Sequence, residues 1–184
     1  MGVFDILGRF AEVLVKLVPH LLLIRATCGG VKWVNGKKVV GLGPGLHWYW
    51  PITTDVDVIV TARQTLNLPT QVLTTKDRKS VVVGGLVVYR IMDVVRAIGE
   101  RNFDVDDTVR DVCMAALMEV VSDLNFDDLL TNPKDVSVNL KQSARKALRK
   151  FGVSVVHAFL TDLSQCKTYR LIGDGDGNKR IAVS

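Results

Sequence analysis

The sequence predicts an α+β fold in which a mixed β-sheet packs against helices. The first half alternates short apolar runs with turn signals, as in the segments 31–34 and 56–60, which is typical of strands. Between residues 107 and 151 apolar side chains recur every three or four positions, as on the buried side of a helix. Residues 152–163 again resemble a strand, so strands lie on both sides of a helical block.

Composition favours a partner that is apolar and anionic. Hydrophobic residues make up 48% of the 184 residues, and the net charge is +5. Most of the excess lies in residues 1–40, where six Lys or Arg accompany two Asp or Glu. A basic, apolar N-terminus suits anionic lipid headgroups, whereas no basic helix or aromatic–basic strand suggests nucleic acid. The three cysteines form neither a disulfide framework nor a zinc spacing.

Residues 3–24 predict an amphipathic helix with a very wide apolar face. Pro19 is expected to kink it or to end its first part, leaving a short apolar second part. An in-plane or half-inserted membrane helix is the preferred interpretation; a true span and a helix buried against protein are the alternatives. The narrow polar stripe consists of Asp5, Arg9, Glu12, Lys16 and His20. The apolar residues expected to enter the membrane are Val3, Phe4, Ile6, Leu7, Phe10, Leu14, Leu17, Leu21, Leu22, Leu23 and Ile24.

Residues 41–51 predict a shaped corner. Glycines and a proline at its start supply unusual backbone angles and interrupt a sheet ladder. Trp48, Tyr49 and Trp50 follow at once, and such rings suit a membrane interface or a partner surface. His47 is interpreted as a hydrogen-bonded residue that shapes the corner, not as a catalytic base.

The remaining strands follow from alternation and turns. Asn35-Gly36 predicts a hairpin with a type I′ turn. Strands are expected at 56–60, at 64–68 up to Pro69, at 71–75, and at 80–91, where Gly84-Gly85 suggests a bulge. Near the C-terminus, 169–172 and 180–183 are expected to pair as a hairpin. No heptad repeat follows residue 163.

Helices are predicted at 94–99, capped by Asp93, at 107–122, at 126–130, and from Pro133 to residue 151. The last helix carries a row of basic residues, for which a solvated face and a lipid or partner surface are both open. These residues are Lys141, Arg145, Lys146, Arg149 and Lys150.

Several short motifs occur in a fixed order: "PGLH" at 44–47, "TKD" at 75–77 and "YRI.D" at 89–93. In this order, from about residue 24 to 163, the chain resembles the SPFH family, also called band 7 or prohibitin homology, which includes stomatin, prohibitin, flotillin and HflK/C. The motif residues carried over as structural are Gly43, Pro44, Gly45, His47, Pro51, Lys76, Asp77, Tyr89, Arg90 and Asp93.

The resemblance implies a domain that sits on a membrane and packs side by side into rings or cages. It divides the chain into a membrane-associated helix (1–25), an SPFH domain (26–163) and a tail (164–184). The expected function is a homo-oligomeric scaffold of a membrane microdomain; a regulatory adaptor for a membrane protease or channel is the alternative. Monotopic or peripheral attachment is expected, with the domain on one side, for instance the cytoplasmic face. Without a coiled coil, any ring wall would come from SPFH domains alone.

No catalytic constellation is recognisable. The three histidines occur in unrelated contexts, and HExxH, CxxC and G-x-S-x-G patterns are absent from the sequence. We therefore expect no enzymatic activity, no metal and no cofactor.

Overall fold

The computed structural model describes residues 18–99, 104–166, 169–173 and 179–183 and confirms the α+β class. The described strands form four sheets, where the sequence suggested one mixed sheet. The chain divides into two compact units. As far as they are described, the N-terminal unit comprises residues 18–63, 90–105 and 150–153, and the helical unit comprises residues 64–89, 106–149 and those from 154 onward.

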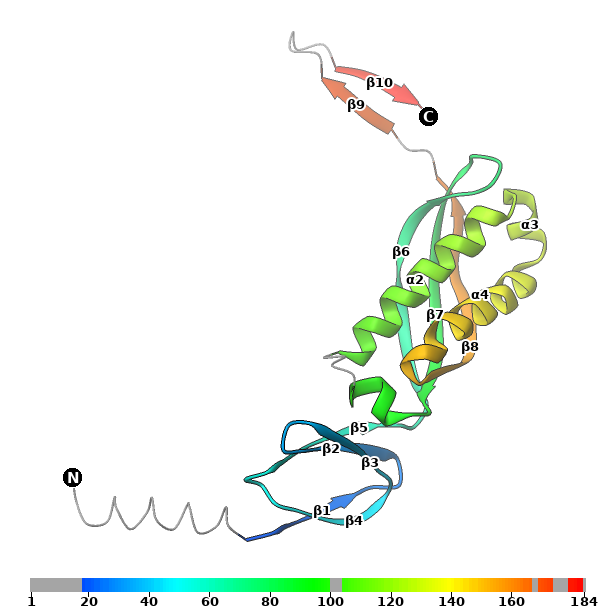
Figure 1. The fold of residues 1–184 in the computed structure, drawn as a ribbon. Coiled ribbons are helices and arrows are strands. Elements are labelled where there is room, and N and C mark those ends of the chain that lie inside the picture. The colour runs from blue at the N-terminus through cyan, green and yellow to red at the C-terminus, as the bar shows by residue number, and fades with distance from the viewer. Residues whose placement is uncertain (1–17, 100–103, 167–168, 174–178, 184) are drawn as a thin grey trace. The chain divides into compact units, whose positions relative to one another are not determined.

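The N-terminal unit is built from two antiparallel sheets. Its strands are β1 (His20–Ile24), β2 (Cys28–Val34), β3 (Lys38–Leu42), β4 (Gly45–Tyr49) and β5 (Thr54–Val60) (Figure 1). One sheet has the order β3-β2-β5, and the other pairs β1 with β4. Asn35 and Gly36 have φ values of 54° and 64°, which confirms the type I′ hairpin turn between β2 and β3.

The predicted N-terminal helix is wrong for its last five residues. His20–Ile24 form strand β1, paired with β4. A continuous apolar run can be read with either period, and here pairing with the strand that follows the Gly-Pro corner decides in favour of the strand. The earlier part of the predicted helix, up to residue 17, lies outside the described residues.

The predicted corner is shorter than expected, because Gly45–Tyr49 within it form strand β4. Gly43 and Pro44 make the bend between β3 and β4, and Gly45 has φ +135°, a conformation that glycine adopts readily. The glycines thus turn the chain, and the aromatic residues continue as a strand.

Gly152 holds a tight junction in the N-terminal unit. Its carbonyl accepts hydrogen bonds from the backbone N–H groups of Met92 (2.8 Å) and Asp93 (3.1 Å). Gly152 has φ +71°, and a Cβ there would lie 2.5 Å from the Asp93 carbonyl oxygen. Asp93 also caps the π-helix η1 (Val95–Gly99) by accepting the N–H of Arg96 at 3.2 Å. The positive φ and the close approach of the Asp93 carbonyl oxygen both require glycine at position 152.

The helical unit contains the three-stranded sheet β6-β7-β8. Its strands are β6 (Gln64–Thr74), β7 (Ser80–Ile91) and β8 (Val153–Gln165). Residues 64–75, predicted as two strands, form the single strand β6 with a register shift between Leu68 and Gln71. The shift lies opposite Gly84 and Gly85, so the predicted irregularity is there, but its extra residue belongs to β6.

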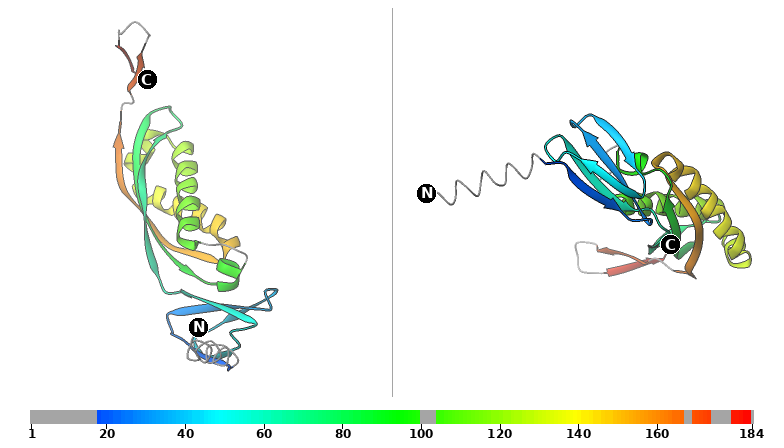
Figure 2. Two further views of the ribbon diagram at one scale, coloured as in Figure 1. Left: turned by 90° about the vertical axis from the view of Figure 1, so that its left-hand side faces the viewer. Right: turned by 90° about the horizontal axis from the view of Figure 1, so that it is seen from below.

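Helices cover one face of this sheet. The long helices α2 (Val105–Asp123) and α4 (Pro133–Leu148) lie on the same side of it, as the views of Figures 1 and 2 show. The short helix α3 (Phe126–Thr131) lies between them in the chain, and a 3₁₀ turn (Arg149–Phe151) follows α4. The core between sheet and helices includes Val81, Val83, Val87, Val109, Leu117, Val121, Leu129, Leu140 and Leu148.

Asp77, of the "TKD" motif, joins a turn to a helix. It accepts hydrogen bonds from the Thr75 hydroxyl (2.5 Å) and from the backbone N–H of Phe126 (3.1 Å), and it pairs with Lys79 at 3.1 Å. The Thr75 hydroxyl bond is the largest cause that lowers the pKa of Asp77 to about 2; desolvation of the carboxylate opposes it, and the bonds from Lys79 and the Phe126 N–H lower the pKa further. The ionised carboxylate therefore stabilises the start of α3.

The C-terminal hairpin is confirmed in its pairing. Strands β9 (Tyr169–Gly173) and β10 (Lys179–Val183) run antiparallel, with Val183 opposite Tyr169.

Replacing Gly152 by Ala should destabilise the fold by about 2 kcal/mol or more, because the new methyl group meets the Asp93 carbonyl in a left-handed conformation. Gly36→Ala is the matched control: its φ is also positive, but no atom lies within 4 Å of the added Cβ, so only about 1 kcal/mol should be lost. Urea unfolding measures both. Equal losses would show that the junction is not tight.

Asp77→Asn should lower the stability of the protein at pH 7. Because the folded pKa lies below the ordinary value of 3.8, the carboxylate's contribution is complete above about pH 4 and is lost as pH falls towards 2. Unfolding followed from pH 5 to pH 2 should therefore show a steeper loss for the wild type than for the variant. At pH 7, the exposed Asp55→Asn should change stability by no more than about 0.5 kcal/mol. Parallel pH curves for wild type and Asp77→Asn would contradict the assignment.

Candidate membrane-facing surface

An apolar face lies on the outside of the β1–β4 ribbon. Leu21 pairs directly with Trp48, and Leu23 pairs with Leu46. Alternation along both strands and direct pairing across them place these four side chains on one side of the ribbon. Their exposed fractions are 51%, 64%, 69% and 57%, respectively. We call these four residues the ribbon face.

The opposite side of the same ribbon faces the protein. Leu22 pairs with His47, and Ile24 pairs with Gly45. Ile24 is 2% exposed, and a Cβ on Gly30 of strand β2 would lie 2.9 Å from its Cδ1 atom. One side of the ribbon thus packs on β2 through Ile24, whereas the ribbon face is apolar and turned to solvent, which is unusual for a soluble protein.

Other exposed apolar residues flank the ribbon in the chain. Val18 precedes β1, and Trp50 and Ile52 follow β4, with exposed fractions of 58%, 52% and 61%. At the end of the ribbon His20 and Tyr49 make an edge-to-face ring contact at 5.8 Å. Val18, Leu21 and Leu23 all belong to the segment 3–24 that the sequence analysis predicts to enter the membrane interface.

The structure separates the predicted membrane residues into three groups. Leu21, Leu23, Trp48 and Trp50 are exposed. Leu22 and Tyr49 are half-buried. The prediction that Ile24 enters the membrane is wrong, because Ile24 is buried in the core of the N-terminal unit. The predicted residues Val3, Phe4, Ile6, Leu7, Phe10, Leu14 and Leu17 lie outside the described part of the chain.

Three residues of this surface were missed in the sequence: Val18, Leu46 and Ile52. The signal was present, since Leu46 and Trp48 alternate with His47 as outward positions of a strand. It was overlooked because residues 41–51 were interpreted as a corner without a strand.

The corner motif fixes the turn that leads into strand β4 of the ribbon. His47 Nε2 lies 2.8 Å from the carbonyl oxygen of Gly43, so the imidazole closes the turn across Pro44. Pro51 follows the strand and is half-buried. The His47 contact thus fixes the backbone of β4 beside Trp48, so these motif residues have a structural role.

The other motif residues lie elsewhere and make structural contacts. Tyr89 is 1% exposed, and its hydroxyl donates to the Asp106 carboxylate. Lys76 donates its backbone N–H to Leu124 at 3.0 Å, and Arg90 is exposed at the end of β7.

The described residues contain no group of three or more His, Cys, Asp or Glu placed to hold a metal ion. His157 stacks on Phe159 at 5.8 Å, whereas His47 binds a backbone carbonyl. Within the same residues, no helix has the length and apolar character needed to cross a bilayer.

The comparison with protein families matches residues 24–171 to the SPFH domain / Band 7 family. Similar proteins include an uncharacterized protein of Archaeoglobus fulgidus, 25% identical over 90% of this chain and 66% of that protein. A stomatin homologue of Pyrococcus horikoshii is 24% identical over 82% of this chain and 56% of its own length. Mouse stomatin is 22% identical over 66% of this chain and 42% of its own length.

The chain thus spans between two fifths and two thirds of the relatives described. The family match covers most of the chain, including the corner motif and the strands and helices from β2 to β8. The chain belongs to the SPFH domain / Band 7 family.

Proposed function

We propose that this protein is a membrane-attached scaffold whose SPFH domains assemble laterally into a large homo-oligomer. The observation that carries the membrane part is the ribbon face, where two cross-strand pairs of large apolar residues stand exposed. Exposed Trp beside Leu is the composition that favours the bilayer interface. Family membership supports a scaffold role in general.

The ribbon face alone would bind lipid weakly. Each of its four side chains has about half of its surface left to bury, worth about 1 kcal/mol apiece. Together they supply about 4 kcal/mol, which corresponds to a dissociation constant of about 1 mM. Stable attachment therefore needs either the segment before residue 18 as a second anchor or many copies in one particle.

Basic residues of the same unit fit an anionic membrane. Arg25, Lys37 and Lys38 are exposed, and each basic residue close to an anionic surface contributes about 1 kcal/mol at ordinary salt. We therefore expect binding to increase with the fraction of anionic lipid and to fall as salt rises.

Sedimentation with vesicles tests the attachment. The double variant Leu23→Ser/Trp48→Ser, in a chain lacking residues 1–17, should bind at least about tenfold more weakly than the same chain with the natural ribbon face. Val72→Ser is the control, because Val72 is 59% exposed but lies on β6; it should bind as the parent does. The cut is placed after residue 17 because β1 is part of the fold. Equal binding of all three chains would exclude the ribbon face.

Particle size tests the scaffold. The full-length protein extracted in mild detergent should form closed particles of many copies, visible by negative-stain imaging. Monomers or small oligomers would contradict the scaffold and favour a regulatory adaptor instead. Mild crosslinking separates the two in the same sample, because a scaffold gives a ladder of its own multiples and an adaptor gives a hetero-complex.

A further inference from the structure

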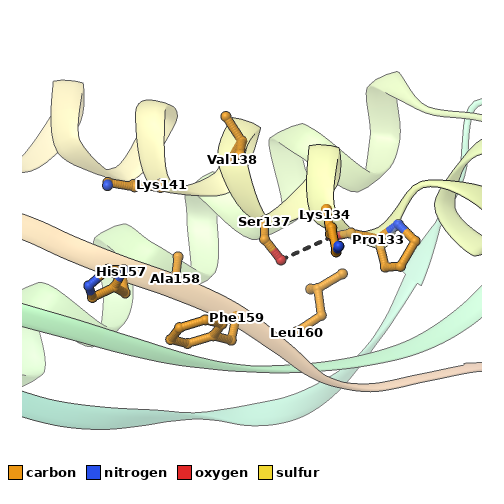
Figure 3. A pocket seen from close by; sticks show the side chains of 9 residues that line it. All are labelled: Pro133, Lys134, Ser137, Val138, Lys141, His157, Ala158, Phe159 and Leu160. Atoms are coloured by element: carbon orange, nitrogen blue, oxygen red, sulfur yellow. Dashed lines mark hydrogen bonds between the residues drawn. The ribbon is translucent and has the colours of Figure 1, made fainter.

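The helical unit carries an open groove between α4 and the middle of β8. It has a volume of about 370 Å³, and Figure 3 shows the side chains of both elements around it. Val138 and Phe159 in its lining are 50% and 49% exposed. The lining residues are Pro133, Lys134, Ser137, Val138, Lys141, His157, Ala158, Phe159 and Leu160.

The helix side of the groove has a regular pattern. Lys134, Val138 and Lys141 are four and three positions apart on α4, so they form one stripe of charge, apolar group and charge. The rise from the first lysine to the second is about 10.5 Å. Neither lysine makes an ion pair within the described residues, and the lining contains no carboxylate.

The strand side of the groove is a sheet edge. In the order β6-β7-β8 the strand β8 has a neighbour on one side only, as far as the chain is described. Residues 157–160 belong both to this edge and to the groove. An edge strand offers backbone N–H and C=O groups to a further strand, and here that further strand would lie beside an apolar floor.

We propose that this groove binds an extended segment of a partner protein, which adds to the edge of β8 as a strand. The segment carries acidic, apolar and acidic side chains at alternate positions, so that all three point the same way. The acidic groups lie about 13 Å apart in a strand, within reach of the flexible side chains of Lys134 and Lys141. The apolar group packs against Val138 on the helix side of the groove. This mode combines main-chain hydrogen bonds with pockets for alternate side chains.

The chemistry of the groove favours an acidic partner segment over a basic or purely apolar one. Two cations in a lining without carboxylates attract acidic side chains and repel basic ones. The open form of the groove suits a chain passing through it, and its apolar floor discriminates against a segment that is only charged. The site belongs to the helical unit, so the proposal does not depend on lipid binding by the ribbon face.

The test uses the whole protein and a fluorescent seven-residue peptide, the glutamate–leucine peptide, followed by fluorescence anisotropy. This peptide has glutamate, leucine and glutamate at positions 2, 4 and 6 and serine at the other positions, so that the three side chains point the same way in a strand. Lys134→Glu/Lys141→Glu should weaken binding by about tenfold or more. Lys146→Glu is the matched control, because Lys146 is an exposed lysine of the same helix outside the lining; it should change binding by less than about twofold. Val138→Ser, at a half-exposed position, should also weaken binding severalfold.

Three further peptides distinguish the occupants. The same peptide with lysine in place of both glutamates should not bind, which excludes non-specific apolar binding. The same peptide with serine in place of the leucine should not bind either, which excludes recognition by charge alone. The glutamate–leucine peptide with N-methyl groups on alternate backbone nitrogens should also fail, because it cannot complete a strand ladder. Equal loss for Lys146→Glu and the double variant would overturn the site. Equal binding of the N-methylated peptide would overturn strand addition.

Discussion

The pairing of β1 with β4 is the constraint on which the candidate surface depends. In a paired ribbon the register determines which side chains lie on each side, and a slip of one residue would move the side chains of one strand to the opposite side. The register Ile24 opposite Gly45 places Ile24 against Gly30 of β2. The same register sets Leu21 opposite Trp48 on the outside. One pairing thus provides both the packing of the N-terminal unit and the exposed apolar area.

Much of the fold follows from local sequence signals. Asn35-Gly36 specifies its hairpin, Asp93 caps the following helix, and Pro133 begins α4 as predicted. These features depend on a few neighbouring residues with strong conformational preferences. The family resemblance was carried by motif order, and the family match agrees with it.

What could not be predicted depends on contacts between distant residues. Leu21–Ile24 form an apolar run without a clear period, and only pairing with residues 45–49 decides that they are a strand. The pair of strands expected around Pro69 merges because β7 continues past both of them. The groove could not be foreseen from the sequence because only folding brings its lining residues at 133–141 and at 157–160 together. A basic helix face has the same sequence pattern whether it meets solvent or a ligand.

The irregularity in β6 makes the two edges of the three-stranded sheet different in their ability to pair with a further strand. β6 forms the other edge of the sheet in the described chain, and it contains Pro69 and a register shift between Leu68 and Gln71. Proline lacks the donor that a neighbouring strand would need, and a bulge bends the edge out of line. The sheet can therefore be extended at β8 but is blocked at β6. Successive copies of this chain cannot stack edge to edge into an endless sheet, and the β8 edge stays open without the risk of fibre growth.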